Sequence, residues 1–96
     1  MKVLKEKRFS NCFATYQHVD IYFDEEINRE FIDYLSVIGT VQCNFDVEKP
    51  FFRIKAYVDY LINGAIGNTS LRLLVPIKKC DDIVDAFKIV VDKFQN

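Results

Sequence analysis

The chain has few of the residues that interrupt regular structure or build reactive sites. Its 96 residues include three glycines, two prolines, three cysteines and one histidine, and there is no tryptophan. So few glycines and prolines favour closely connected helices and strands over a fold built from loops. No repeat, low-complexity tract or linker is visible, and the length is close to the commonest domain size. We therefore expect one domain over residues 1–96.

Complete cysteine or metal motifs are also missing. Cys12, Cys43 and Cys80 form no Cys-x-x-Cys pair, and an odd number of cysteines without a secretion signal argues against a disulfide framework. The acidic runs at residues 24–26 and 81–82 suit helix starts better than a calcium loop. The sequence therefore predicts no metal and no cofactor. It favours a binding protein over an enzyme.

Long apolar runs and an excess of positive charge are absent as well. No stretch approaches the ~20 apolar residues of a membrane-spanning helix, and residues 1–8 are too charged for the apolar part of a signal peptide. We expect a cytoplasmic protein with no membrane partner. The net charge is −1, whereas duplex-binding domains usually carry a basic excess, so nucleic acid is a possible but not a favoured partner.

What the chain does have is regular hydrophobic patterning. Half of its residues are hydrophobic, with nine Phe and five Tyr to fill a core. Alternation of apolar and polar residues predicts strands at about residues 13–23, 41–47, 52–58, 60–66 and 69–75. Gly67-Asn68 predicts a two-residue hairpin turn of the primed type. Residues 1–11 are basic and weakly patterned, and they form either a short strand or a mobile arm.

Two further segments repeat apolar residues at helical spacing. We expect the first helix to begin at an Asp24 N-cap and to end at Gly39, and the second to run from Asp81 or Asp82 to Phe94. The apolar stripes are Ile27, Phe31, Tyr34, Leu35 and Ile38 in the first helix, and Ile83, Phe87, Val90, Val91 and Phe94 in the second. With one stripe each, both helices can cover the same face of a sheet.

The resulting order, β-α-β-β-β-β-α, predicts a single α+β domain with a mainly antiparallel, curved sheet and two helices on one face. The connections between the four consecutive strands are too short for parallel crossovers. Over about residues 13–95 this order resembles the TATA-box-binding-protein-like topology, in which helices lie on the convex side of a curved antiparallel sheet. A ferredoxin-like arrangement is the competitor, although it would place a helix before the final strand. Such a resemblance of topology implies no function.

The sheet face opposite the helices is the best candidate for binding. Arg53, Lys55 and Tyr57 alternate along one predicted strand and so share a face, and Arg72 lies on the strand after next. Such side chains can hold phosphates and stack bases, or dock an acidic protein segment. They can equally form an ordinary solvated face with cross-strand pairs. We single these four residues out as ligand-binding candidates.

A cysteine gives the sharpest enzymatic alternative. Cys80 follows Lys78 and Lys79 just before the second helix, and both the helix N-terminus and the cations would lower a thiol pKa. Asp81 and Asp82 oppose this effect. Cys80 is therefore a candidate reactive thiol.

Taken together, these patterns favour a small non-catalytic binding or assembly module that acts through the open sheet face or an edge strand. Because exposed sheet edges must be paired, charged or covered, we expect a homodimer, or docking of another protein. The alternatives are a nucleic-acid-binding module that uses the Arg/Lys/Tyr face, and a cysteine-dependent redox or sulfur-transfer protein.

Overall fold

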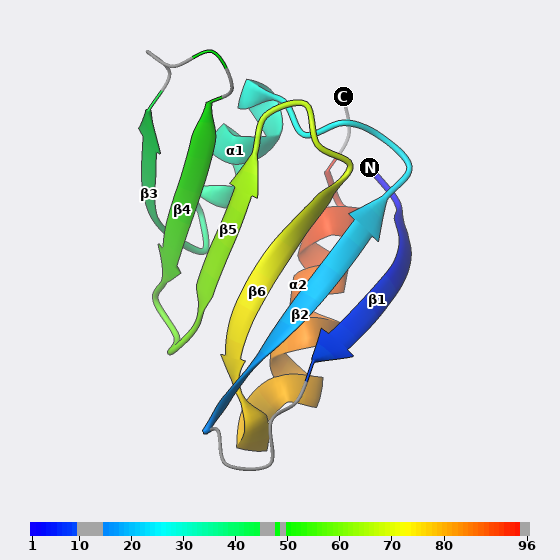
Figure 1. Cartoon of the computed structure of the whole chain (residues 1–96), viewed down its shortest axis with the longest axis vertical. Coiled ribbons are helices and arrows are strands. Elements are labelled where there is room, and N and C mark those ends of the chain that lie inside the picture. The colour runs from blue at the N-terminus through cyan, green and yellow to red at the C-terminus, as the bar shows by residue number, and fades with distance from the viewer. Residues whose placement is uncertain (10–14, 45–47, 49, 95–96) are drawn as a thin grey trace.

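The computed structural model describes residues 1–9, 15–44, 48 and 50–94, and it shows one sheet with two helices (Figure 1). The elements in chain order are β1 (Val3–Phe9), β2 (Tyr16–Phe23), α1 (Arg29–Leu35), β3 (Gly39–Asn44), β4 (Phe51–Ala56), β5 (Leu61–Ala65), β6 (Ser70–Pro76), the 3₁₀ turn η1 (Ile77–Lys79) and α2 (Cys80–Asp92). The strand order is β1-β2-β6-β5-β4-β3, and every neighbouring pair is antiparallel.

The predicted α+β class and element order are confirmed. Within residues 1–11, which the sequence left open, Val3–Phe9 form a sixth strand at one edge of the sheet. The TATA-box-binding-protein-like and ferredoxin-like topology names stay predictions. Phe13, Phe45 and Val47, which the sequence assigned to strands, lie outside the described residues.

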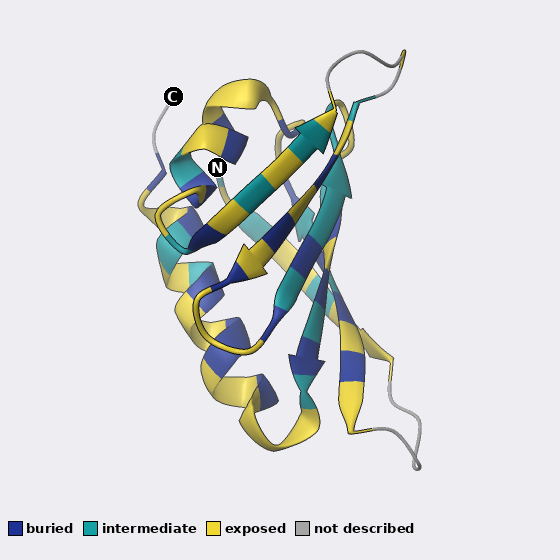
Figure 2. Ribbon diagram, turned by 90° about the vertical axis from the view of Figure 1, so that its left-hand side faces the viewer, coloured by how far each residue is buried: buried dark blue, intermediate teal, exposed yellow. Residues whose placement is uncertain are grey.

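Both helices lie on the same side of the sheet (Figure 2). The hydrophobic core fills the layer between the sheet and the two helices. Alternate side chains of β2 and β6, among them Ile21 and Leu73, are fully buried there against Phe31 of α1 and Phe87 of α2. Burial of one such side chain stabilises the fold by about 1.5–3 kcal/mol. Neither of the two described helices lies over the opposite face of the sheet.

Helix α1 begins four residues later than the sequence predicts. Asn28, rather than Asp24, is its N-cap, and the Asn28 side chain accepts a hydrogen bond from the Phe31 amide at 2.9 Å. The Asp24 carboxylate instead accepts from the Lys2 amide at 2.8 Å. The intervening Ile27 is buried and exchanges backbone hydrogen bonds with residues 67 and 68, which hold it outside the helix. Asp24 and Asn28 are both well suited to capping, and the tertiary contacts decide which of them caps the helix.

The sequence predicts that Gly39 ends the first helix, but in the structure Gly39 is the first residue of β3. Helix α1 ends at Leu35, and Gly39 lies opposite Ala56 of β4. A Cβ atom on Gly39 would lie 2.3 Å from the Lys55 carbonyl oxygen. Glycine is therefore needed here for close backbone approach, not for its left-handed conformation.

The turn between β5 and β6 also differs from the prediction. Gly67 has a φ of 90°, but Asn68 has no positive φ, so the pair does not form a type I′ turn. The Asn68 amide instead bonds to the Ala65 carbonyl at 3.3 Å, which places Gly67 third in the turn. A positive φ at that position is typical of type II turns, where glycine is favoured.

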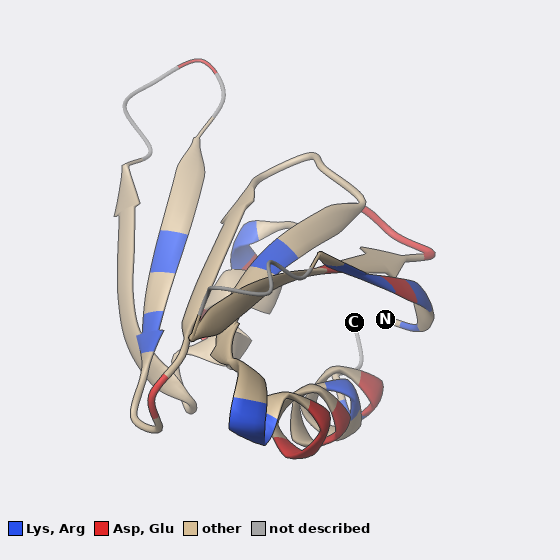
Figure 3. Ribbon diagram, turned by 60° about the horizontal axis from the view of Figure 1, so that its bottom comes forward, with Lys and Arg blue, Asp and Glu red and all other residues tan. Residues whose placement is uncertain are grey.

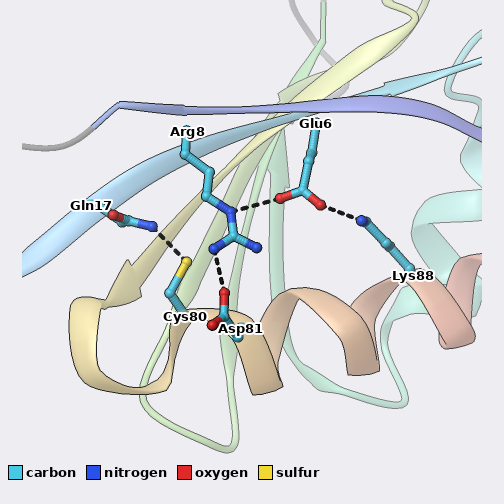
Figure 4. A network of polar contacts seen from close by, with 6 residues as sticks. All are labelled: Glu6, Arg8, Gln17, Cys80, Asp81 and Lys88. Carbon is cyan, nitrogen blue, oxygen red and sulfur yellow. Dashed lines mark hydrogen bonds and ion pairs between the residues drawn. The ribbon is translucent and has the colours of Figure 1, made fainter.

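A network of charged side chains joins β1 to α2 (Figure 4). Arg8 donates from Nε to Glu6 at 2.7 Å and from its guanidinium to Asp81, and Lys88 donates to the second Glu6 oxygen. Burial works to raise the pKa of Glu6, but the hydrogen bonds from Lys88 and Arg8 outweigh it and leave that pKa below its ordinary value. The network therefore stabilises the fold while Glu6 is ionised.

We predict that Glu6→Gln lowers the free energy of unfolding by about 1 kcal/mol at pH 7, because Lys88 and Arg8 lose their shared partner. A lowered folded-state pKa contributes stability that is present above the unfolded pKa and is lost as pH falls through the folded pKa. The difference between wild type and Glu6→Gln should therefore shrink as pH falls below the unfolded pKa of about 4.3, and it should vanish below the lowered folded pKa. Urea unfolding at several pH values measures it. A difference independent of pH would contradict this assignment.

Candidate ligand-binding face

The side chains on the uncovered side of the sheet form what we call the open face. Its centre is a row of cross-strand partners, one from each strand, which we call the central row. In sheet order from β3 to β1 the row is Gln42, Arg53, Asn63, Arg72, Asp20 and Lys7. Residues that are paired directly across neighbouring strands point to the same face of the sheet, so all six side chains lie on the open face.

The strands that form the open face carry mainly Lys and Arg, whereas helices α1 and α2 carry more Asp and Glu than Lys and Arg (Figure 3). Within the described strands the open face carries five cations, Lys5, Lys7, Arg53, Lys55 and Arg72, against the single carboxylate of Asp20. Helices α1 and α2 carry six carboxylates, Glu30, Asp33, Asp81, Asp82, Asp85 and Asp92, against two cations, Arg29 and Lys88. The charges are therefore unevenly distributed between the open face and the two helices, although Lys78, Lys79 and Lys93 flank α2.

Hydrogen bonds hold the middle of the central row in place. Arg72 makes a two-pronged contact with Asp20, from Nε to Oδ1 at 2.7 Å and from a terminal nitrogen to Oδ2 at 3.1 Å. The hydrogen bond to Asp20 raises the pKa of Arg72 above its already high ordinary value. The Arg53 Nε donates to the Asn63 side-chain oxygen at 3.0 Å. These contacts orient both guanidinium groups across the sheet.

Aromatic side chains flank the central row. Phe51 of β4 and Phe9 of β1 are 59% and 40% exposed, unusually high values for phenylalanine. The Lys7 ammonium and the Arg72 guanidinium lie 5.1 and 5.5 Å from the centre of the Phe9 ring, and Lys5 lies 4.7 Å from that of Tyr22. The cations and the rings of this face therefore share one surface.

Two shallow depressions lie along the central row. The larger, about 510 Å³, is lined from β3, β4 and β5 by residues that include Phe51 and Arg53. The smaller, about 210 Å³, is lined from β5, β6 and β2 by residues that include Asp20 and Arg72. Both are lined by Asn63 and Gly64, so they form one trough that crosses the strands.

Three of the four residues singled out from the sequence, Arg53, Lys55 and Arg72, lie on the open face. Tyr57 does not join them, because β4 ends at Ala56 and Tyr57 lines a groove beside α2. Sequence reasoning did not assign Lys5, Lys7, Phe9, Asp20 and Tyr22 to this face, because their places depend on the pairing of β2 with both β1 and β6. For Asp20 and Tyr22, the only sequence signal was the alternation of apolar and polar residues along β2.

Tyr57 instead lines an apolar groove of about 530 Å³ on the helical side of the molecule, together with Val58, Ile83 and Phe87. Tyr57 and Val58 are 76% and 61% exposed. This groove is separate from the open face and shares no lining residue with the trough.

The candidate thiol is enclosed. Cys80 is the first residue of α2 and is only 4% exposed, and the buried Gln17 side chain donates a hydrogen bond to its sulfur (Figure 4). Cys43 on β3 is partly exposed, and burial raises its pKa, an effect to which Asp33 adds and which Arg29 opposes. The reactive-thiol hypothesis stays a prediction, and the enclosure of the Cys80 sulfur works against it.

Two further features concern the part of the chain that the structure describes. No group of three His, Cys, Asp or Glu side chains there could hold a metal ion. None of the described helices combines the length and the apolar character needed to cross a membrane. Comparison of the chain with protein-family models, curated proteins and solved structures finds no match.

We predict that iodoacetamide labels Cys43 of the native protein faster than Cys80, and that Cys80 reacts only when urea unfolds the chain. The reason is that access controls the reaction as strongly as thiolate content does. Mass spectrometry of tryptic peptides after timed labelling at pH 7 measures both rates. Rapid labelling of native Cys80 would instead support the thiol enzyme.

Proposed function

We propose that this protein is a small non-catalytic binding module that holds an extended anionic partner on its open face. The observation that carries the proposal is the concentration of cations there, opposite two helices whose own residues are mainly acidic. Arg53, Lys55 and Arg72, the three cations expected from the sequence, are joined on this face by Lys5 and Lys7.

Four of these cations have no carboxylate partner among the described residues. Asp20 is engaged by Arg72, whereas no ion pair with a carboxylate is formed by Lys5, Lys7, Arg53 or Lys55 in that part of the chain. Four like charges on one face repel one another, and a bound anion relieves that repulsion. The acidic helices add a field of the opposite sign, so that an anion approaching in solution is steered to the open face.

The trough favours a partner that crosses the strands. From β3 to β2 it spans four strand spacings, which is about 19 Å. The bonded pairs Arg72–Asp20 and Arg53–Asn63 are set before any partner arrives, which reduces the side-chain entropy lost on binding. A preformed, shallow and charged channel of this length suits a chain-like polyanion.

The direct test removes two cations from the trough side of β4. We predict that Arg53→Gln with Lys55→Gln weakens binding of a labelled heparin oligosaccharide at least about tenfold at 50 mM salt. It should also reduce the slope of log affinity against log salt by about two, since each lost cation releases one counterion fewer. Fluorescence polarisation across a salt series measures both quantities.

The matched control removes two cations elsewhere. Lys78→Gln with Lys79→Gln makes the same change in net charge, and both residues are exposed on η1, beyond the end of β6. This control should bind nearly as well as wild type. Equal loss in both double variants, or no heparin binding by wild type at 50 mM salt, would overturn the proposal.

Edge pairing into a homodimer is a second candidate, and the two sheet edges differ in a way that favours one of them. β1 carries four consecutive charges, Lys5 to Arg8, which discourage pairing with another strand. β3 carries no charged residue along Gly39–Asn44. Pairing of β3 with β3 of a second copy would extend the open face across both protomers.

We predict a dimer mass in light scattering at high micromolar concentration, and a monomer mass for Gln42→Lys, since a lysine on an edge strand opposes pairing. Because Gln42→Lys adds a cation to the open face, it should not weaken anion binding. A monomer mass for this variant would therefore report on assembly alone. Asn68→Lys, at the exposed β5–β6 turn, is the control and should remain dimeric. A monomeric wild type would remove this candidate.

A further inference from the structure

The aromatic residues of the open face identify the class of anion. We propose that the partner is a single-stranded nucleic acid, whose phosphates contact the cations of the central row while its bases stack on Phe51, Tyr22 and Phe9. This inference rests on the proposed function, because it requires the open face to bind an anion. It goes further in requiring a partner with exposed planar rings.

Phe51 and Arg53 make the first pair of contacts. They lie two residues apart on β4, so their Cα atoms are about 7 Å apart along the strand and both side chains point to the open face. Both line the larger depression, and Phe51 is 59% exposed. A ring and a cation side by side at one depression can take the base and the phosphate of the same nucleotide.

Tyr22 extends this arrangement across the sheet. Phe51 is paired with Ala65, and Tyr22 is paired with Ser70. The register Gly64 to Leu71 puts Ala65 and Ser70 next to each other, so Phe51 and Tyr22 stand in one cross-strand row beside the central row. Three strand spacings, about 14 Å, separate them. Two rows therefore run side by side across the sheet, one with cations and one with rings.

Phe9 stands on the other side of the central row. It is paired with His18, two residues along β2 from Asp20, and it contacts both Lys7 and Arg72 through its ring. Every one of the three rings thus lies within one or two positions of a cation. Stacking of a base on an aromatic ring tolerates any sequence, because every base has a π-face.

An acidic peptide or a duplex would use this surface less completely. A peptide of Asp and Glu residues would satisfy the cations but would leave Phe51 and Phe9 in water. A duplex stacks its bases on one another, so their faces are closed to the protein. Exposed rings that lie among cations are accounted for best by a strand whose bases are open.

The test compares single strands that differ only in their bases. We expect 12-nucleotide strands of oligo(dT) and oligo(U) to bind at 50 mM salt more tightly than an abasic strand of the same length and charge. One stacked base is worth roughly a 5- to 150-fold change in affinity. Relative affinities of the DNA and RNA strands identify which sugar the face prefers. Fluorescence polarisation reports each binding constant.

The matched variants are Phe51→Leu and Tyr57→Leu. Both remove an exposed aromatic ring, but Tyr57 lines the groove beside α2 and lies off the open face. Phe51→Leu should weaken the oligo(dT) complex at least about fivefold and leave the abasic complex unchanged, whereas Tyr57→Leu should change neither. Phe9→Leu should repeat the effect from the other side of the central row.

The outcomes separate this inference from the proposed function. Equal binding of the abasic and base-bearing strands, or no effect of Phe51→Leu and Phe9→Leu, would overturn the nucleic-acid inference and leave a polyanion module in place. So would a poly-glutamate or a 12-base-pair duplex that binds as tightly as oligo(dT). If the wild-type protein binds neither the oligonucleotides nor heparin, both proposals are overturned.

Discussion

Each strand of an antiparallel sheet sends alternate side chains to opposite faces, and in this protein helices cover only one of the two faces. The positions turned to the helices must be apolar, because their burial is the main source of stability. The positions between them carry no such requirement. On β4 the buried Phe52 and Ile54 alternate with Arg53 and Lys55. The residues between the buried positions of each strand thus determine the chemistry of the open face.

The same alternation explains which parts of the molecule could be predicted. β6 and α2 carry strong apolar periods, and Arg53, Lys55 and Arg72 follow from parity alone. Parity failed for Tyr57, because β4 ends at Ala56 and Tyr57 lines the groove beside α2. The start of α1 has a local signal in the Asn28 cap, but the choice of Asn28 over Asp24 depends on contacts of Ile27 with residues 67 and 68.

Charge separation changes how the composition should be interpreted. A net charge of −1 argues against polyanion binding only if the charges are evenly mixed, and here the cations outnumber the carboxylates on the open face while the carboxylates outnumber the cations within the two helices. The field of such a molecule has a direction, which matters more for encounter with a charged partner than the total does. Small antiparallel sheets with helices on one side can acquire this polarity without any change in overall composition.

The strand β1 carries a last consequence. Three residues of the open face, Lys5, Lys7 and Phe9, belong to β1, whose other face offers Glu6 and Arg8 rather than an apolar pair. A slip of one residue exchanges the two faces of a strand, and hydrophobic pattern normally forbids it. In β1 that safeguard is replaced by the ion pairs to Asp81 and Lys88. Helix α2, on the covered side of the sheet, therefore fixes the register of β1 and with it the positions of Lys5, Lys7 and Phe9 on the open face.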